Sequence, residues 1–271
     1  MPVDPLAEPF RAAGGRTGVL LVHGFTGSPA SMVPWAESLA ADGFTVSVPR
    51  LPGHGTSWRD LNRTRWSDWY AEACQALDAL HADCDEVFVC GLSMGGCLSL
   101  RLAEERPDDV AGLVLVNPSV ASARKDLLAV PVAKWLVPSL AGIGNDIKKS
   151  GVTEHGYDRT PLKAVDSLRA LWRVTREDLP KVTTPVLLFR SLVDHVVEPL
   201  SSQLVMQRVS SRDLTERRLD DSYHVATLDN DAPAIFAESA QFIREHSRAN
   251  HQVRGDVREQ ESRFPGGADA V

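Results

Sequence analysis

Residues 87–105 read VFVCGLSMGGCLSLRLAEE and hold the pattern that decides the fold. A run of apolar residues ends in the pentapeptide Gly91-Leu92-Ser93-Met94-Gly95, and helix-forming residues follow at once. The pattern predicts a buried strand that turns directly into a helix, with Ser93 on a sharp, strained turn. Glycines on either side of the serine let strand and helix pass close together without Cβ clashes. Ser93 is therefore a candidate nucleophile, and the alternative is an ordinary tight turn.

The rest of the chain repeats the alternation of strand and helix. Six segments rich in β-branched residues are candidate strands: 17–24, 44–51, 86–91, 111–117, 184–191 and 214–220. Five of these six look like strands. Helical patterns fill the gaps at about 29–41, 66–81, 94–105, 199–209 and 231–246. Nearly continuous apolar strands are typical of a parallel sheet covered on both faces. The sequence therefore predicts an α/β fold with a mainly parallel sheet and helices on both of its faces.

Other segments depart from this alternation. Residues 118–180 lie between two core strands and exceed what one crossover helix needs, so we expect a small cap insertion there. The polar residues 247–271 are predicted to be a disordered tail, and residues 1–15 an N-terminal extension. The core domain then comprises residues 16–117 and 181–246.

Composition excludes several classes of function. The net charge of −7 argues against nucleic-acid binding, which needs a concentrated basic surface. Lys134 and two prolines interrupt the most apolar long run, residues 127–144, so no transmembrane segment is expected. The N-terminus lacks the features of a signal peptide, which favours a cytoplasmic location with reduced cysteines. The sequence contains neither the metal-binding motif HExxH nor the nucleotide-binding motif GxxxxGK(S/T), so neither a metal nor another cofactor is expected.

A serine hydroxyl needs a base to remove its proton and a carboxylate to orient that base. Asp194 follows the apolar segment 184–191, and His224 lies after the last predicted strand and before the last predicted helix. This is the order Ser, acid, His that strand-turn-helix serine hydrolases use. The sequence therefore predicts the triad Ser93, Asp194 and His224.

Rival residues for the acid and the base lie close to these two. His195 is the rival for the base. It adjoins Asp194 on the same loop, which is poor geometry for a triad. The rivals for the acid are Glu198, Asp220 and Asp221, none of which sits directly past an apolar core strand.

Acyl transfer also needs backbone N–H groups that stabilise the oxyanion. Met94 follows the nucleophile and is the first expected donor. Phe25, in the loop HGFTGSP after the first apolar strand, is the second. The loop LPGHG at residues 51–55 is expected to hold the site and to take no part in the chemistry.

These residues resemble the α/β-hydrolase carboxylesterases and, among them, the bacterial thermostable monoacylglycerol lipases. The resemblance spans about residues 17 to 246 through VLLVHGFTGSP, LPGHGTS, VFVCGLSMGG, NDIKKSGVTEHGYDRTP, DHVVEP and SYHVATLDND. It implies the α/β-hydrolase fold with a small cap insertion, and the same triad and oxyanion donors. The cap motif makes the resemblance specific, because a generic hydrolase would not share it.

The resemblance also implies substrate-binding residues in the cap. Glu154 would bind the glycerol hydroxyls, although by itself it reads equally well as a solvated surface charge. The run 127–144 would line a tunnel for the acyl chain, with Ile143 near its mouth. The competing interpretation of this run is a buried contact between cap and core.

The predicted function is hydrolysis of a monoacylglycerol to fatty acid and glycerol through an acyl-enzyme. The alternative is a carboxylesterase of broad specificity for short-chain acyl esters. A third hypothesis, of another class, is a ligand-binding module that uses the fold without catalysis, and a complete triad speaks against it. The only expected partner is a small lipid ester, and the sequence leaves open whether the chain forms a homodimer.

Overall fold

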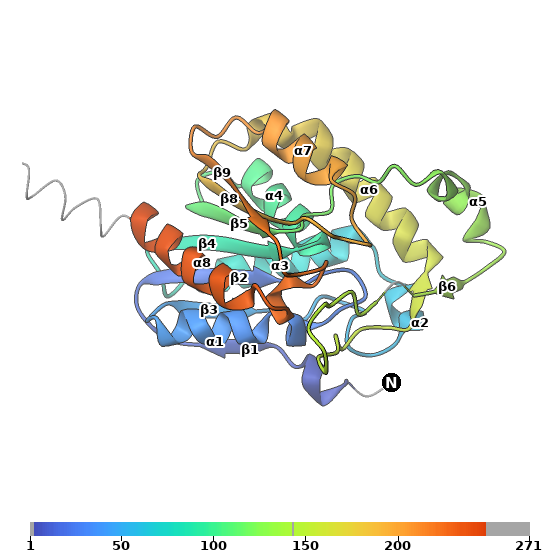
Figure 1. The fold of residues 1–271 in the computed structure, drawn as a ribbon, viewed down its shortest axis with the longest axis horizontal. Coiled ribbons are helices and arrows are strands. Elements are labelled where there is room, and N and C mark those ends of the chain that lie inside the picture. Colours follow the sequence, from blue (N-terminus) through green and yellow to red (C-terminus); the bar gives the residue numbers. More distant parts are fainter. Residues whose placement is uncertain (1–2, 143, 248–271) are drawn as a thin grey trace, which may run out of the picture.

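A computed structural model describes residues 3–142 and 144–247, and its centre is a seven-stranded sheet (Figure 1). The strand order is β1-β3-β2-β4-β5-β8-β9, and all neighbours are parallel except β1 and β3. The strands are β1 (Phe10–Ala12), β2 (Thr17–Val22), β3 (Thr45–Val48), β4 (Glu86–Leu92), β5 (Gly112–Val116), β8 (Val186–Ser191) and β9 (Leu214–Leu219). The prediction of a mainly parallel sheet is confirmed, and all six candidate segments contain strands.

Strand β1 was not predicted. It lies within residues 1–15, which the sequence suggested were an extension, and it pairs antiparallel with β3 through Phe10 and Val48. It forms one edge of the sheet, so the core begins earlier in the chain than residue 16.

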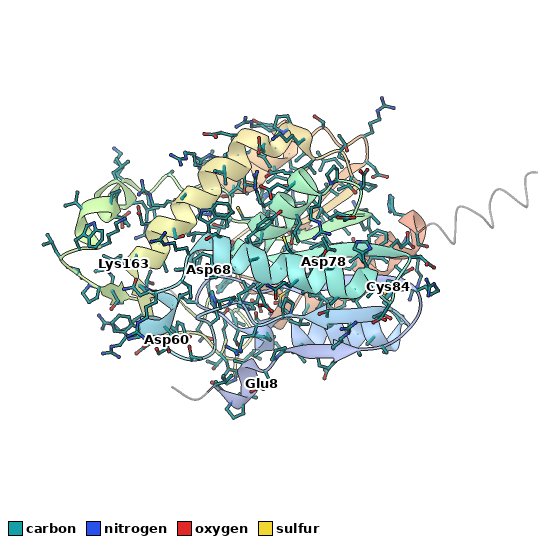
Figure 2. The ribbon with its side chains drawn as sticks, turned by 180° about the vertical axis from the view of Figure 1, so that it is seen from behind. Glu8, Asp60, Asp68, Asp78, Cys84 and Lys163 are labelled. Carbon is teal, nitrogen blue, oxygen red and sulfur yellow. The ribbon has the colours of Figure 1, made fainter. Side chains whose placement is uncertain are left out.

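Helices cover both faces of the sheet, as predicted (Figures 1 and 2). One face is covered by α1 (Val33–Ala41) and α8 (Ala232–His246). The other face carries α3 (Trp66–His81), α4 (Met94–Glu105), α6 (Leu162–Asp178) and α7 (Leu200–Arg208). The short helices are η1 (Pro5–Ala7), η2 (Pro29–Ser31), α2 (Trp58–Leu61), η3 (Lys125–Ala129), α5 (Val130–Ala133), η4 (Leu179–Lys181) and η5 (Ala226–Leu228).

Alternate side chains of each central strand enter two separate apolar cores. In β2, Leu20 and Val22 face the α3 and α4 side, whereas Val19 and Leu21 face the α1 and α8 side. All four are fully buried. Burying such a side chain contributes roughly 1.5–3 kcal/mol, which explains why the central strands are apolar at every position.

The chain between β5 and β8 forms the insertion. It contains η3 and α5, which project away from the sheet in Figure 1, and a two-stranded antiparallel sheet of β6 (Ser139–Ala141) and β7 (Arg159–Pro161). Helix α6 follows and packs against α3 and α4. The last part of the insertion therefore belongs to the helical layer that covers the sheet. In the described part of the chain, no helix has the length and apolarity needed to cross a membrane.

Candidate active site

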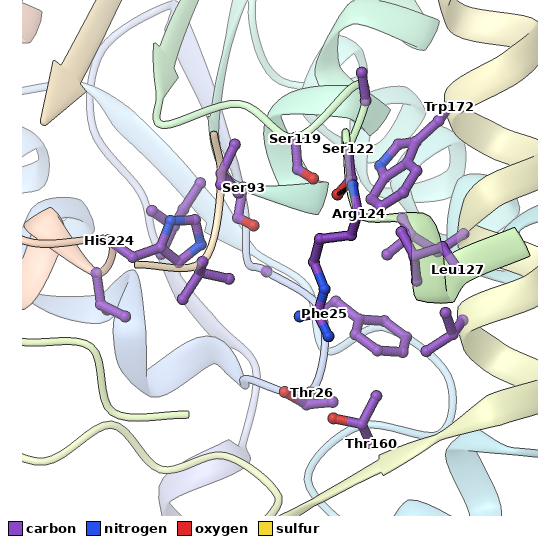
Figure 3. Close-up of a pocket in the computed structure, with 18 of the residues that line it drawn as sticks. Phe25, Thr26, Ser93, Ser119, Ser122, Arg124, Leu127, Thr160, Trp172 and His224 are labelled. Atoms are coloured by element: carbon purple, nitrogen blue, oxygen red, sulfur yellow. Dashed lines mark hydrogen bonds between the residues drawn. The ribbon is translucent and has the colours of Figure 1, made fainter. Parts of the chain in front are cut away.

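Ser93 lies between the end of β4 and the start of α4. Its backbone has φ 56° and ψ −116°, a conformation that costs a non-glycine residue roughly 1–3 kcal/mol. Its N–H donates to the Val116 carbonyl at 3.0 Å, and its own carbonyl accepts from Ser119 N–H at 3.0 Å. Neighbouring β5 and the segment after it therefore hold the strained turn. The Ser93 hydroxyl points into a pocket (Figure 3).

Gly91 and Gly95 are required by the close approach of the chain around this turn. A Cβ on Gly95 would lie 1.9 Å from the Val22 carbonyl oxygen of β2. A Cβ on Gly91 would lie 2.5 Å from the Gly95 carbonyl carbon. Both obstacles are backbone atoms, which cannot swing aside, so the two glycines let α4 start directly against the sheet.

Asp194 and His224 come together from two different loops. Asp194 follows β8, and its Oδ1 accepts hydrogen bonds from the N–H groups of Val196 and Val197, each at 2.8 Å. Its Oδ2 lies 2.8 Å from Nδ1 of His224, which follows β9. Both side chains are over 90% buried. Because Nδ1 donates its proton to the carboxylate, Nε2 is left as the basic nitrogen.

The charges around His224 stabilise its protonated form. Burial by itself lowers the pKa of His224, but attraction to Asp194, the hydrogen bond with it and the nearby carboxylates of Glu154 and Asp146 more than offset this. The resulting pKa is above the usual value for histidine. For Asp194, burial raises the pKa, but the partner imidazole and the two backbone N–H groups lower it further, so the carboxylate stays ionised. The pair is thus suited to accept a proton at Nε2.

The loop after β2 places Phe25 in the lining of the same pocket as Ser93 (Figure 3). Among the described residues, neither the Phe25 nor the Met94 backbone N–H has a protein hydrogen-bond acceptor. Met94 is the first residue of α4, where N–H groups have no partner within the helix. Two unpaired donors near a strained serine are the arrangement that an oxyanion requires.

His23 fastens this loop to the loop 51–55. It is fully buried, and desolvation lowers its pKa to about 4, so it is neutral. Its Nδ1 donates to the Gly24 carbonyl at 3.0 Å and its Nε2 accepts from the Leu51 N–H at 3.2 Å. Tyr157 of the insertion joins the same region, because its hydroxyl donates to the Gly53 carbonyl at 2.7 Å and its N–H donates to the Thr26 carbonyl at 3.0 Å.

The rival acids and the rival base lie elsewhere. The His195 ring contacts Asp146 and Tyr223 and does not line the pocket. Glu198 accepts hydrogen bonds from Ser122 Oγ and the Ala123 N–H. Asp221 forms an ion pair with Lys148. Among the candidate acids in the described chain, it is therefore Asp194 that bonds to the His224 imidazole.

The pocket next to Ser93 has an apolar part and a polar part. The apolar part is formed largely by the insertion, through Leu127 and the α6 residues Val165, Leu168 and Trp172. In the polar part lies the carboxylate of Glu154, against the loop after β2: a Cβ on Gly27 would be 2.8 Å from Glu154 Oε1. Burial raises the pKa of this carboxylate, although the His224 imidazole and a backbone hydrogen bond from Asn145 act in the opposite direction.

The prediction for the run 127–144 is wrong for most of its residues. Leu127 lines the pocket, but the larger apolar side chains beyond it face solvent: Leu128, Val132, Trp135, Leu136, Val137 and Leu140. These side chains are 40–80% exposed, so they form neither a tunnel nor a buried contact with the core. Ile143 lies outside the described residues. The apolar wall comes instead from α6, whose core-facing side chains were not singled out in the sequence.

Asn117, which was not predicted, supports the loop of His224. It directly follows β5 and has φ 45°. Its side-chain amide donates to the His224 carbonyl at 2.8 Å and to Ser191 Oγ at 2.9 Å, and its oxygen accepts from the Ser191 N–H at 2.8 Å. It therefore ties the histidine loop to the carboxyl ends of β5 and β8. An asparagine placed directly after an apolar strand was the available signal.

Comparison with known proteins agrees with this geometry. A family model described as serine aminopeptidase, S33, matches residues 15–231. The chain belongs to this family. A thermostable monoacylglycerol lipase from Bacillus sp. (strain H-257) is 43% identical over 91% of this chain and 98% of its own length. A carboxylesterase from Bacillus subtilis (strain 168) is 24% identical over 87% of this chain and 96% of its own length.

Solved structures extend this agreement to three dimensions. A structure reported for the metagenome-derived lipolytic enzymes LipS and LipT has a TM-score of 0.88 and 42% identity, and covers 90% of this chain and all of that one. The monoacylglycerol lipase of Paleococcus ferrophilus has a TM-score of 0.72 at 21% identity and supports the fold. The α/β-hydrolase fold predicted from the sequence is confirmed.

Proposed function

We propose that this protein is a serine hydrolase that cleaves the ester bond of a monoacylglycerol to give a fatty acid and glycerol. One observation carries the proposal: the strained Ser93 opens into a pocket with an apolar wall on one side and the carboxylate of Glu154 on the other. An acyl chain fits the apolar wall, and glycerol hydroxyls are hydrogen-bond donors to a carboxylate. The similarity to monoacylglycerol lipases supports the same substrate class.

The proposed reaction has two halves. His224 Nε2 takes the proton of the Ser93 hydroxyl as its oxygen attacks the ester carbonyl, and the Phe25 and Met94 N–H groups stabilise the oxyanion. His224 then protonates the glycerol oxygen as the ester C–O bond breaks. A water molecule, deprotonated by His224, attacks the acyl-enzyme and releases the fatty acid. Asp194 orients the imidazole and stabilises its charge throughout.

Replacing Glu154 with alanine tests the choice of substrate. We expect kcat/KM for monoacylglycerols to fall roughly 10- to 100-fold, because a hydrogen bond to a charged group contributes about 1.5–3 kcal/mol. Turnover of a nitrophenyl ester, which has no glycerol, should stay near the wild-type value. The measurement is kcat/KM for both substrates, each at the pH plateau of the variant, because Glu154 also acts on the pKa of His224.

The matched control is Glu177→Ala, which changes an exposed glutamate of α6 away from the pocket. Equal losses on both substrates, or no loss on either, would favour the alternative of a broad esterase for short-chain acyl esters.

Five exposed apolar side chains of the insertion support a lipid substrate, and together they are called its apolar surface: Leu128, Val132, Trp135, Leu136 and Leu140. This surface borders the pocket, because Leu128 follows Leu127 and Leu140 pairs with Thr160, and both Leu127 and Thr160 line the pocket. Exposed apolar patches of this kind mark interaction sites. We therefore expect this surface to contact the lipid phase that contains the substrate.

The double variant Trp135→Ser, Leu136→Ser tests this contact. Hydrolysis of monoacylglycerol in phospholipid vesicles should fall about tenfold or more, because each buried large side chain contributes about 1.5–3 kcal/mol. Hydrolysis of a water-soluble nitrophenyl ester should be unchanged. Leu6→Ser, at a residue that is 54% exposed in η1, is the control. An equal rate on vesicles for double variant and wild type would refute the contact.

A cytoplasmic location also remains a proposal. All four cysteines are free, as expected for a reducing compartment.

A further inference from the structure

Asp146, in the insertion, contacts both loops that carry the proposed acid and base. Its Oδ2 accepts the backbone N–H of His195 at 3.0 Å and that of His224 at 3.2 Å. Its Oδ1 lies 2.7 Å from the His195 ring nitrogen Nδ1. Its backbone carbonyl accepts the Val225 N–H at 3.1 Å. Asp146 thus binds His195, which follows Asp194 in the chain, and it also binds His224 and Val225.

The segment that carries Asp146 is itself firmly held. Asp229, 1% exposed, accepts the N–H groups of Lys148 and Lys149 at 2.7 and 2.8 Å and that of Tyr223 at 2.9 Å. The carboxylates of Asp146 and Asp229 therefore hold the insertion against the loop of His224. These contacts fix the position of Asp146.

The residue before Asp146 links it to the substrate pocket. Asn145 has φ 64°, and its side-chain oxygen accepts the Glu154 N–H at 2.9 Å. Two adjacent residues thus join Glu154, which lines the pocket, to the loops of Asp194 and His224. Asp146 does not line the pocket, so it acts only through the residues it holds.

We propose that Asp146 is a positioning residue that holds the loops of Asp194 and His224 in catalytic register and fastens the substrate-binding insertion to them. The inference rests on the proposed triad. Its physical basis is that the side chain is only 13% exposed, so its loss leaves two backbone N–H groups without their acceptor. The loop of His224 is then free to move, and a displacement of about 1 Å can reduce the rate about 100-fold.

Two substitutions separate the hydrogen bonds from the charge. Asp146→Ala removes every side-chain acceptor. Asp146→Asn keeps an oxygen that can accept the two backbone N–H groups. It also places an amide NH₂ opposite His195 Nδ1, and this nitrogen can then accept a hydrogen bond from the amide. A positioning role predicts that asparagine rescues what alanine loses.

The kinetics use a water-soluble nitrophenyl butyrate, so the outcome does not depend on the proposed glycerol recognition. For Asp146→Ala we expect kcat to fall about 10- to 100-fold with KM within about threefold of wild type. For Asp146→Asn we expect kcat to recover to within about threefold of wild type. Asp166→Asn is the control, because it makes the same change at an insertion carboxylate whose ion pairs are with Lys134 and Arg169.

The pH profile of kcat/KM gives a second readout. The carboxylates that act on His224 are Asp194, Glu154 and Asp146, and all three raise its pKa. Asp146→Asn removes one negative charge, so the pKa of His224 falls and the acidic limb of the profile moves to lower pH. The charges of Asp194 and Glu154 remain, so the limb keeps its shape. If Asp146→Ala does not fold, the test rests on Asp146→Asn, which should keep kcat near the wild-type value and show the shifted acidic limb.

The proposal is overturned if Asp146→Ala keeps kcat within about threefold of wild type. It is also overturned if asparagine fails to rescue the rate, if the acidic limb stays in place, or if Asp166→Asn loses as much activity. Failure of the triad itself is distinguishable, because Ser93→Ala would then remain active.

Discussion

Replacing Ser93 with alanine is expected to lower kcat for every ester by about 10⁴- to 10⁶-fold, the range found when a nucleophile acting within a triad is lost. Without the Ser93 oxygen no acyl-enzyme can form, and only the proposed oxyanion donors and substrate binding remain to assist attack by water. Binding should survive, because the other side chains that line the pocket are unchanged. The measurement is kcat for a monoacylglycerol and for a nitrophenyl ester with the purified variant.

The variant should fold normally, because no hydrogen bond of the described chain depends on the Ser93 hydroxyl. Thermal unfolding of wild type and variant checks this. Covalent labelling with a fluorophosphonate is the matched control: wild type should be labelled and Ser93→Ala should not. Labelling of the variant, or a kcat above about 1% of wild type, would remove Ser93 from its proposed role.

The fold was largely predictable because burial acts on consecutive residues. Residues such as Val19 to Val22 are fully buried on both faces of the sheet, so the chain carries an unbroken apolar run that is visible without a structure. Strand β1 escaped notice because three residues are too few to show a period and its side chains are only partly buried or exposed. A short edge strand depends on its pairing with β3 rather than on its own composition.

The proposed triad was also predictable, since each member lies in the segment that follows a strand, and the carboxyl ends of parallel strands meet at one edge of the sheet. Asp146 and Asn117 were not identified, because their contacts join segments that are 49 to 107 residues apart in the chain. Composition likewise did not reveal which way the run 127–144 faces. An apolar side chain that meets a lipid phase and one that lines a protein interior look the same in the sequence.

Replacing Gly95 with alanine is expected to destabilise the protein by about 3 kcal/mol or more. In an ordinary helix the same change stabilises by roughly 1 kcal/mol, because alanine is the better helix former. Here the new Cβ would lie 1.9 Å from the Val22 carbonyl oxygen and 2.8 Å from that of His23. Helix α4 or strand β2 must then shift, and both are embedded in the core. Urea unfolding monitored by circular dichroism gives the change in free energy.

Gly151→Ala is the control, because Gly151 has φ 79° with no atom within 4 Å of its added Cβ. Gly151→Ala should lower the free energy of unfolding by about 1 kcal/mol, through backbone strain alone. If Gly95→Ala were as stable as wild type, the close contact between α4 and β2 would not exist. A catalytic consequence is also expected: the loop after β2 carries Phe25, so a shift that relieves the clash would move this proposed oxyanion donor relative to Ser93. Gly95→Ala protein that still folds should therefore lose kcat, whereas Gly151→Ala should not.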